Sequence, residues 1–266
     1  MSNQGMSNQG MSNSATPSSH IDPLFDLTGK VALVTGGSRG LGYEMVKAFA
    51  AHGADIIIAS RKLDACEAVA SEVRSMGRKA VAIAAHVGKW GECDRLIEES
   101  YAAFGRIDIL VNNAGMGPRV PSHEVTEDLF DKVVSLNFKG PFRLASVIGK
   151  RMFDGDGGSI INVSSTGGSM PLPEVVPYSS AKAALNAMTL SLAHEYGPRV
   201  RINTLSAGPF LTDISKAWTP EMREHANNAL GRPGLPHEVV TSALYLASPA
   251  SSFTTASMLR VDGGTW

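Results

Sequence analysis

The sequence has few of the residues that mark a disulfide-bonded, metal-binding or membrane protein. Its two cysteines, Cys66 and Cys93, suit neither a disulfide framework nor a zinc ligand set. The seven histidines never occur as His-x-x-x-His, so no metal site is expected. No apolar run is long enough to span a bilayer, and the formal net charge of −1 gives no reason to expect nucleic-acid or membrane partners. This composition favours a reducing, cytoplasmic location.

The first twenty residues differ from the rest of the chain. The run Met-Ser-Asn-Gln-Gly occurs at 1–5 and again at 6–10, and a third copy begins at Met11. The segment is polar and lacks the basic and apolar parts of a secretory signal. We therefore expect a disordered, low-complexity tail at 1–20 and one folded domain over 21–266.

From Lys30 onward, short β-branched runs alternate with stretches of helical periodicity, a pattern typical of βαβ units and a parallel sheet. The expected strands are almost continuously apolar, as in strands that are covered on both faces. They are Val31–Thr35, Asp55–Ser60, Ala80–Val87, Ile107–Asn112, Ser159–Ser164, Val200–Ser206 and Met258–Val261. Helices are expected between them, including one over Ser179–Tyr196. The sequence therefore predicts an α/β fold, a single-domain doubly wound (Rossmann) seven-stranded parallel sheet flanked by helices.

Tyr178 and Lys182 are the first candidates for chemistry. At the start of a helix, positions i and i+4 share one face, with Cβ atoms about 5–6 Å apart. An ammonium fixed at about 5 Å would favour the phenolate by roughly 3 kcal/mol at an effective dielectric of about 20. Lys182 is therefore expected to lower the pKa of Tyr178 toward neutrality, where a phenol can both donate and accept protons.

A glycine-rich loop follows the first expected strand and precedes a helix, the context that a dinucleotide-binding loop requires. Glycines let the backbone approach a pyrophosphate closely, and a helix N-terminus supplies unpaired N–H groups. The expected contacts of this loop are Gly36, Ser38, Arg39, Gly40, Leu41 and Gly42. The alternative is a tight turn between strand and helix that binds nothing.

The end of the second expected strand indicates which dinucleotide binds. An NAD enzyme places Asp or Glu there for the ribose hydroxyls, whereas this chain has Ser60 and Arg61. Arg61 and Arg39 together would bind a 2′-phosphate. NADP(H) is therefore favoured over NAD(H); the alternative is that Arg61, next to Lys62, faces water.

Together these residues resemble the short-chain dehydrogenase/reductase family over about residues 25–266. Its marks appear in the family's order: Thr35-Gly36-x-x-x-Gly40-x-Gly42, Asn112-Asn113-Ala114-Gly115, Asn137, Ser165, Tyr178-x-x-x-Lys182 and Val261-Asp262-Gly263-Gly264. The segment 25–36 resembles members named 3-oxoacyl-carrier-protein reductase and gluconate 5-dehydrogenase. The resemblance implies an oxidoreductase that interconverts a carbonyl and a secondary alcohol, assembled as a homotetramer. With the two arginines above, the expected cofactor is NADP(H).

The resemblance implies four catalytic residues. Tyr178 would be the proton donor for reduction and the base for oxidation, and Lys182 would hold the nicotinamide ribose. Ser165 lies 13 residues before Tyr178 and would hydrogen-bond the substrate oxygen; that spacing favours it over Ser164. Asn137 would support a water relay that returns protons to Lys182.

The resemblance also implies the remaining cofactor contacts. They are His86, Val87, Asn113, Ala114, Gly115, Gly208, Phe210 and Thr212, in addition to Tyr178 and Lys182. His86 stands where an aspartate usually contacts adenine, so its ring or only the backbone would serve there. Two further departures are Ala207, where a proline is usual, and Ala256, where a glycine is common.

The motifs do not specify the small-molecule substrate. The resemblance of segment 25–36 leaves two candidate classes, a 3-oxoacyl thioester and a sugar acid or polyol. Candidate pocket residues are Met116, Arg119, Met170, Leu172, Glu174, Phe210 and Trp218, with the segment 213–235 as a mobile lid. The methionines and Trp218 could equally be packing residues. An alternative function is a non-catalytic nucleotide-sensing module, although such relatives usually lack the tyrosine or the lysine. The helix over Ser179–Tyr196 has a side of small residues and methionine that suits packing on another subunit or on its own sheet.

Overall fold

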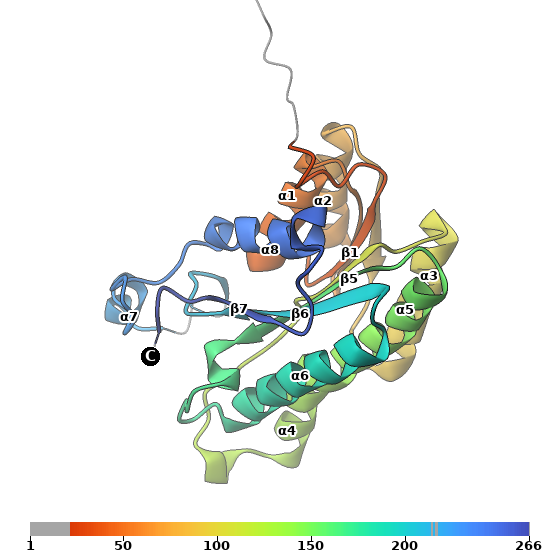
Figure 1. The fold of residues 1–266 in the computed structure, drawn as a ribbon. Coiled ribbons are helices and arrows are strands. Elements are labelled where there is room, and N and C mark those ends of the chain that lie inside the picture. The colour runs from red at the N-terminus through yellow and green to blue at the C-terminus, as the bar shows by residue number, and fades with distance from the viewer. Residues whose placement is uncertain (1–21, 214, 216–217, 266) are drawn as a thin grey trace, which may run out of the picture.

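A computed structural model describes residues 22–213, 215 and 218–265. The expected tail over 1–20 lies outside the described residues. The fold is the predicted one, a Rossmann-like α/β structure with seven parallel strands in the order β3-β2-β1-β4-β5-β6-β7 (Figure 1). The strands are β1 (Val31–Thr35), β2 (Asp55–Ser60), β3 (Ala80–Ala84), β4 (Ile109–Asn112), β5 (Gly158–Ser165), β6 (Val200–Ala207) and β7 (Met258–Val261).

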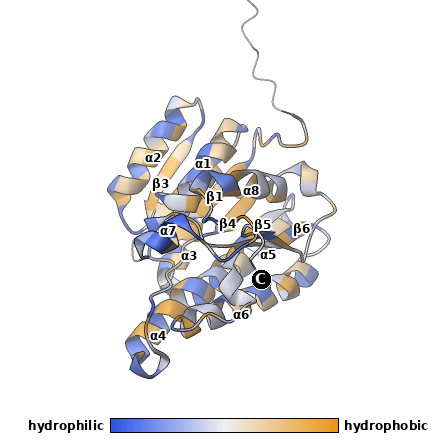
Figure 2. Cartoon of the chain, turned by 90° about the vertical axis from the view of Figure 1, so that its left-hand side faces the viewer, coloured by the Kyte–Doolittle hydropathy of each residue, from blue (hydrophilic) through white to orange (hydrophobic). Residues whose placement is uncertain are grey.

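Helices cover both faces of the sheet. They are α1 (Gly40–Ala51), α2 (Leu63–Ser75), α3 (Trp90–Phe104), α4 (Glu127–Val134), α5 (Gly140–Asp154), α6 (Val176–Glu195), α7 (Pro220–Glu224) and α8 (Val240–Ala247). Short helical turns are η1 (Ser122–Glu124), η2 (Ser135–Lys139), η3 (Thr166–Gly168), η5 (Pro236–Val239) and η6 (Pro249–Ser251). Helices α1, α2 and α8 share one hydrophobic core with the sheet, and α3, α5 and α6 share the other. Figure 2 shows hydrophobic strands between these two helix layers.

The strand order places the site. β1 is paired with β2 on one side and with β4 on the other, so the chain direction of the crossovers reverses between β1 and β4. In open parallel sheets, ligands bind at the carboxyl ends of the strands at such a switch point. The segments that carry the candidate residues after β1, β4, β5 and β6 all begin at this edge of the sheet.

Strand β3 is shorter than predicted. It ends at Ala84 rather than at Val87, because the chain turns there: the Lys89 N–H donates to the carbonyl of His86 at 2.9 Å. The Gly88 N–H donates to the His86 ring at 3.2 Å. Val87 is still buried, so the apolar run continued past the strand for packing rather than for sheet pairing.

Helix α6 begins at Val176, three residues earlier than predicted, with Pro177 in its first turn, where a missing N–H costs nothing. It ends at Glu195, one residue before the predicted end at Tyr196. Its apolar side, including Ala181, Leu185 and Met188, is buried against the chain's own sheet.

Candidate active site

Four side chains from three parts of the fold converge at the carboxyl edge of the sheet. Ser165 is the last residue of β5, Tyr178 lies in the first turn of α6, and Lys182 follows one turn later. Asn137 belongs to the turn η2 between α4 and α5. A Cβ built on Gly115, after β4, would lie 2.8 Å from the Asn137 Oδ1 and 3.7 Å from the Lys182 Nζ, so Gly115 fills the space between these two side chains.

Lys182 is almost fully buried, at 4% exposure. Its Nζ donates to the carbonyl oxygen of Val163 at 2.7 Å, which fixes the ammonium beside the end of β5. Burial lowers the pKa of Lys182 to about 8, because the charged form loses its hydration. The side chain is therefore able to exchange a proton near neutral pH.

Tyr178 differs from the sequence-based prediction. Burial raises its pKa, and the hydrogen bond with the Ser165 hydroxyl lowers it only in part. The Lys182 Nζ lies 5.8 Å from the centre of the Tyr178 ring. The prediction that Lys182 lowers the Tyr178 pKa is therefore wrong for these side chains on their own, because desolvation of the phenol outweighs the effect of its neighbours.

Asn137 is held by a wide helical turn. η2 is a π-helix, in which the Gly140 N–H donates to the carbonyl of Ser135, five residues back. The buried Asn137 amide donates to the carbonyls of Met116, at 2.8 Å, and of Val133, at 2.9 Å. Single π-turns inside helices are frequent at functional sites, and this one ties the segment after β4 to the helix layer.

The glycine loop after β1 has the geometry of a phosphate cradle. Gly36 has a φ of +65°, and a Cβ on Gly42 would lie 2.4 Å from the carbonyl oxygen of Gly36. Helix α1 begins directly afterwards, and its N-cap residue Arg39 provides no side-chain cap. The unpaired N–H groups of its first turn and its positive dipole end favour an anion. The loop and helix therefore fit the pyrophosphate of a dinucleotide.

Asn113 locks this loop to the end of β4. Its amide nitrogen donates to the carbonyls of Thr35, at 2.9 Å, and of Gly36, at 3.3 Å. The Thr35 hydroxyl in turn accepts the N–H groups of Asn113 and Ala114 at 3.0 and 3.2 Å. These four hydrogen bonds join the ends of β1 and β4 and hold the start of the glycine loop in place.

The end of β2 carries a chain of hydroxyl and thiol contacts. The Ser38 hydroxyl donates to that of Ser60 at 3.0 Å, and Ser60 contacts the Cys66 thiol at 3.0 Å. Arg61 is exposed. Arg39, however, is directed elsewhere, because its Nη1 pairs with the Asp213 carboxylate at 2.9 Å. The two guanidiniums expected at the ribose are therefore not brought together here.

The loop after β6 faces the glycine loop. A Cβ on Gly40 would lie 3.5 Å from the Thr212 side chain. Gly208 packs so closely on the end of β7 that a Cβ would lie 2.5 Å from the Asp262 Cα. The buried Phe210 ring packs on Gly234 and ties this loop to the segment before η5. Ala207, where a proline was noted as usual, is the last paired residue of β6.

Two loops form the rim beside Tyr178. The backbone of Gly117 packs on the Tyr178 ring, and a Cβ there would lie 3.2 Å from its Cγ. On the other side, a Cβ on Gly167 would lie 2.7 Å from the Leu172 Cδ1. Met116 contributes backbone contacts to Asn137, as described above. Met170 follows η3, and its N–H donates to the carbonyl of Thr166 at 2.9 Å.

Arg119 and Glu174 join these two loops. Arg119 donates to the Glu174 Oε2 from Nε at 3.2 Å and from Nη2 at 2.8 Å. Both side chains are about half exposed, and such ion pairs contribute about 0–1 kcal/mol. Glu174 also has a φ of +65°, which disfavours an L residue by about 1–2 kcal/mol. The ion pair alone therefore does not offset the strain of this backbone.

Trp218 is half-buried, and its backbone N–H donates to the carbonyl of Ser215 at 3.0 Å. It belongs to the segment expected to form a lid, of which residues 214, 216 and 217 lie outside the description. Helix α7 also lies within this segment.

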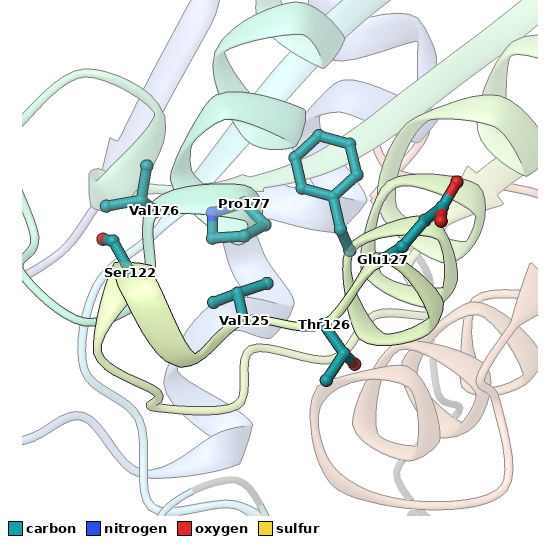
Figure 3. A pocket seen from close by; sticks show the side chains of 7 residues that line it. Ser122, Val125, Thr126, Glu127, Val176 and Pro177 are labelled. Carbon is teal, nitrogen blue, oxygen red and sulfur yellow. The ribbon is translucent and has the colours of Figure 1, made fainter.

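An apolar pocket of about 390 Å³ lies next to the rim but apart from the four candidate catalytic side chains (Figure 3). It is bounded by η1, the start of α4 and the first residues of α6; its lining includes Val125, Phe130 and Pro177. Neither Ser165 nor Tyr178 lines it. Among residues 22–213, 215 and 218–265, no group of His, Cys, Asp and Glu is arranged to hold a metal ion. In the same part of the chain, no helix combines the length and apolarity needed to cross a bilayer.

Sequence reasoning missed several residues that shape the site. Gly117, Cys66 and Asp213 have no motif around them, and only their contacts in the fold reveal them. Gly140 was also missed: a Cβ there would lie 1.8 Å from the carbonyl oxygen of Val87. Its position directly after Asn137-Phe138-Lys139 was the one available signal.

The short chain dehydrogenase family model matches residues 30–223. The chain therefore belongs to the short-chain dehydrogenase/reductase family. An uncharacterized oxidoreductase from Mycobacterium tuberculosis is 39% identical over 247 residues, which are 91% of this chain and 94% of that protein. An NAD-dependent glycerol dehydrogenase from Listeria innocua is 34% identical over 247 residues, 91% of this chain and 96% of the relative.

Solved structures agree with this assignment. One described as a putative NAD(P)-dependent gluconate 5-dehydrogenase from Beutenbergia cavernae, with NADP bound at low occupancy, matches with a TM-score of 0.85 at 30% identity. The match covers 90% of this chain and 98% of that one. The chain is thus an oxidoreductase of this family, and the names of its relatives include both NAD and NADP.

Proposed function

We propose that the chain is an NADP(H)-dependent oxidoreductase that interconverts a carbonyl and a secondary alcohol, with Tyr178 as general acid and base. The observation that carries the proposal is the convergence of Ser165, Tyr178 and Lys182 beside the glycine loop. No comparison supports the non-catalytic alternative.

The residues divide the proton chemistry between them. In reduction, the Tyr178 hydroxyl donates a proton to the substrate oxygen, while the Ser165 hydroxyl donates a hydrogen bond to the same oxygen. In oxidation, Tyr178 accepts that proton. Lys182, whose pKa burial lowers to about 8, holds and releases protons behind Tyr178 near neutral pH. Asn137 positions the Met116 backbone next to this path.

A bound nicotinamide would supply or accept the hydride. Gly36, Gly40 and Gly42, with the uncapped start of α1, would hold its pyrophosphate, because side chains there would fill the cradle. Gly208, Phe210 and Thr212 would flank the nicotinamide, and Lys182 its ribose. His86, Val87, Ala114 and Gly115 would complete the adenosine and ribose contacts.

The preference for NADP(H) rests on charge at the ribose. Ser60 ends β2 and Arg61 follows it, and neither offers a carboxylate to accept a hydrogen bond from a 2′-hydroxyl. Arg39 is 65% exposed in its ion pair with Asp213, so it is able to turn toward a 2′-phosphate. The NADP in the Beutenbergia structure favours this choice, and the NAD-dependent Listeria relative argues for testing both cofactors.

We propose a 3-oxoacyl thioester or a sugar acid or polyol as the substrate class. Support for the sugar and polyol side comes from the glycerol and gluconate activities named for relatives. The rim between Gly117 and Leu172 would receive the substrate next to Tyr178.

The test is a Tyr178→Phe variant, assayed with a panel of ketones, acyl thioesters and sugar acids and with both NADPH and NADH. General acid–base catalysis contributes about 10²–10⁴-fold, so kcat should fall by about that factor while cofactor binding persists. Turnover by Tyr178→Phe at the wild-type rate would exclude the role. A Tyr101→Phe variant on α3 controls for loss of a hydroxyl elsewhere.

We also propose a homotetramer, in the cytoplasm. Large apolar side chains exposed on the α3–α6 layer support assembly; they are Trp90, Phe130, Phe142 and Leu190. Light scattering should give a mass four times that of the 28.1 kDa chain, and a monomer at micromolar concentration would contradict the proposal.

A further inference from the structure

Glu174 fastens the two loops of the rim at two points. Its backbone carbonyl accepts the Val120 N–H at 2.7 Å. Its side chain accepts both bonds from Arg119, at 3.2 and 2.8 Å. The segment after β4 and the segment before α6 are therefore held together where they flank the opening.

This connection lies close to the proposed acid. Arg119 follows Gly117 by two residues, which limits the distance between their Cα atoms to about 7 Å. Gly117 itself packs on the Tyr178 ring, and Glu174 precedes Tyr178 by four residues. A substrate of several carbons whose carbonyl reaches Tyr178 would extend past these two side chains.

The backbone conformation of Glu174 indicates a role in binding rather than in stability. Its φ of +65° is unusual for a residue other than glycine, and its exposed ion pair is too weak to explain the strain. Strained residues cluster at binding sites, where the surrounding structure holds a side chain in a required position. Here the strain aims a carboxylate at Arg119 across the rim.

The pairing leaves polar groups for a ligand. Both bonds from Arg119 end on the Glu174 Oε2, so among the contacts of the described residues Oε1 keeps its acceptor capacity and Nη1 its donor capacity. A hydroxyl group is able to donate to the first and accept from the second. A substrate carboxylate would gain from Arg119 but would be repelled by Glu174.

We propose that Arg119 and Glu174 select a neutral polyhydroxylated substrate, a sugar alcohol and its ketose, over a sugar acid of equal length. This inference rests on the proposed oxidoreductase activity and narrows its substrate class. Arg119 and Glu174 together carry no net charge. Arg119 donates hydrogen bonds to the substrate's hydroxyl groups beyond the reacting carbon, and Glu174 accepts them.

The test compares kcat/KM for a ketose and for the keto acid of the same carbon number, each with saturating NADPH and with saturating NADH. The wild-type protein should favour the ketose at least tenfold. Glu174→Gln keeps the shape but removes the charge, so the keto acid should improve about tenfold while the ketose loses about threefold or more. Arg119→Met should lose activity on the ketose without gaining any on the keto acid.

A matched control is Glu99→Gln on α3, which breaks another Arg–Glu pair of similar exposure. It should leave the ketose to keto acid ratio unchanged. An unaltered ratio in Glu174→Gln, or equal losses on both substrates together with a lowered melting temperature, would overturn the inference and leave the pair a structural fastener. Tyr178-dependent turnover of any carbonyl in the panel would still support the oxidoreductase proposal, so the two failures are distinguishable.

Discussion

The glycine loop and the rim beside Tyr178 stand at the same edge of the sheet, yet they are held in different ways. In the loop, backbone contacts backbone: a Cβ on Gly42 would lie 2.4 Å from a carbonyl oxygen. At the rim, exposed side chains bridge two segments, and a Cβ on Gly117 would meet the Tyr178 ring at 3.2 Å. Gly42 therefore tolerates almost no larger residue, whereas the exposed side chains of the rim can be replaced at little cost in stability.

This difference explains how one fold serves many substrates. The cofactor is common to the family, so the part that holds it is fixed by close packing and carries a spacing motif. The rim that we propose to meet the substrate consists instead of exposed side chains, whose replacement is expected to cost little stability. The relatives named for glycerol and for gluconate carry different substrate names while matching this chain over nine-tenths of its length.

The largest effect is expected at Gly42. A Gly42→Ala change places a methyl group against the carbonyl of Gly36, a backbone atom that cannot move without displacing the loop. Overpacking of this kind costs about 1–3 kcal/mol or more, and cofactor binding should be lost. Thermal unfolding and NADPH fluorescence titration measure the two effects.

Two matched changes sharpen this prediction. Gly117→Ala at the rim should cost less than about 1 kcal/mol, because the ring it meets can shift slightly. Gly91→Ala in α3, where nothing lies within 4 Å, should be neutral or stabilising by up to about 1 kcal/mol. If Gly42→Ala and Gly117→Ala lowered the free energy of unfolding equally, the proposed difference between loop and rim would be wrong.

Lys182 is expected to reduce stability at neutral pH. Its pKa is about 8 in the fold against 10.5 as the ordinary value, so below pH 8 both states are protonated and the full cost of burying the charge is present, about 3 kcal/mol. Between pH 8 and 10.5 the folded state releases its proton first, and stability rises with pH. Lys182→Met should therefore be inactive yet more stable at pH 7, by about 2 kcal/mol after loss of the bond to Val163.

Urea unfolding of wild type and Lys182→Met at pH 7 and pH 9.5 checks this. The gap between them should narrow as the pH rises, and a gap that is constant with pH would contradict the buried charge. The higher stability expected of Lys182→Met also distinguishes the centre of the site from the glycine loop, where no substitution is expected to stabilise the protein.

Arg39 is expected to affect one cofactor only. Arg39→Ala should weaken NADPH binding about tenfold, since a hydrogen bond to a charged group contributes about 1.5–3 kcal/mol, part of which offsets loss of the Asp213 pair. NADH binding should stay within about twofold. Titration of both dinucleotides measures this, and parallel losses would show that Arg39 shapes the loop rather than reads the 2′-phosphate.

The smallest effect is expected at Ala256, which has a φ of +55° before β7. The left-handed conformation costs about 1–2 kcal/mol for alanine, and glycine loses about 0.5–1 kcal/mol in chain entropy. Ala256→Gly should thus stabilise the protein by about 0.5–1 kcal/mol without changing kinetics. A changed KM would mean that the strain at Ala256, like that at Glu174, serves the site.

Much of the fold could be predicted from the sequence because continuous apolar runs and glycine spacing are local signals. Strands β1, β2 and β7 match their predicted bounds, whereas β3 ends early because the apolar residue Val87 packs outside the sheet. The Arg39–Asp213 pair and the contact of Gly117 with Tyr178 join residues far apart in the chain. Such contacts depend on the path of the loops, and no local pattern encodes them.

The π-turn at η2 has a consequence for how this family can change. It carries one residue more than an unbroken α-helix would need, and each residue of a helix turns the chain by about 100°. That extra residue sets both the direction of Asn137 toward Met116 and the side of α5 that faces the sheet. Shortening the helix by a single residue would misplace the Asn137 amide and a packing face of α5 together. A change of chain length is therefore excluded here even where a change of residue is tolerated.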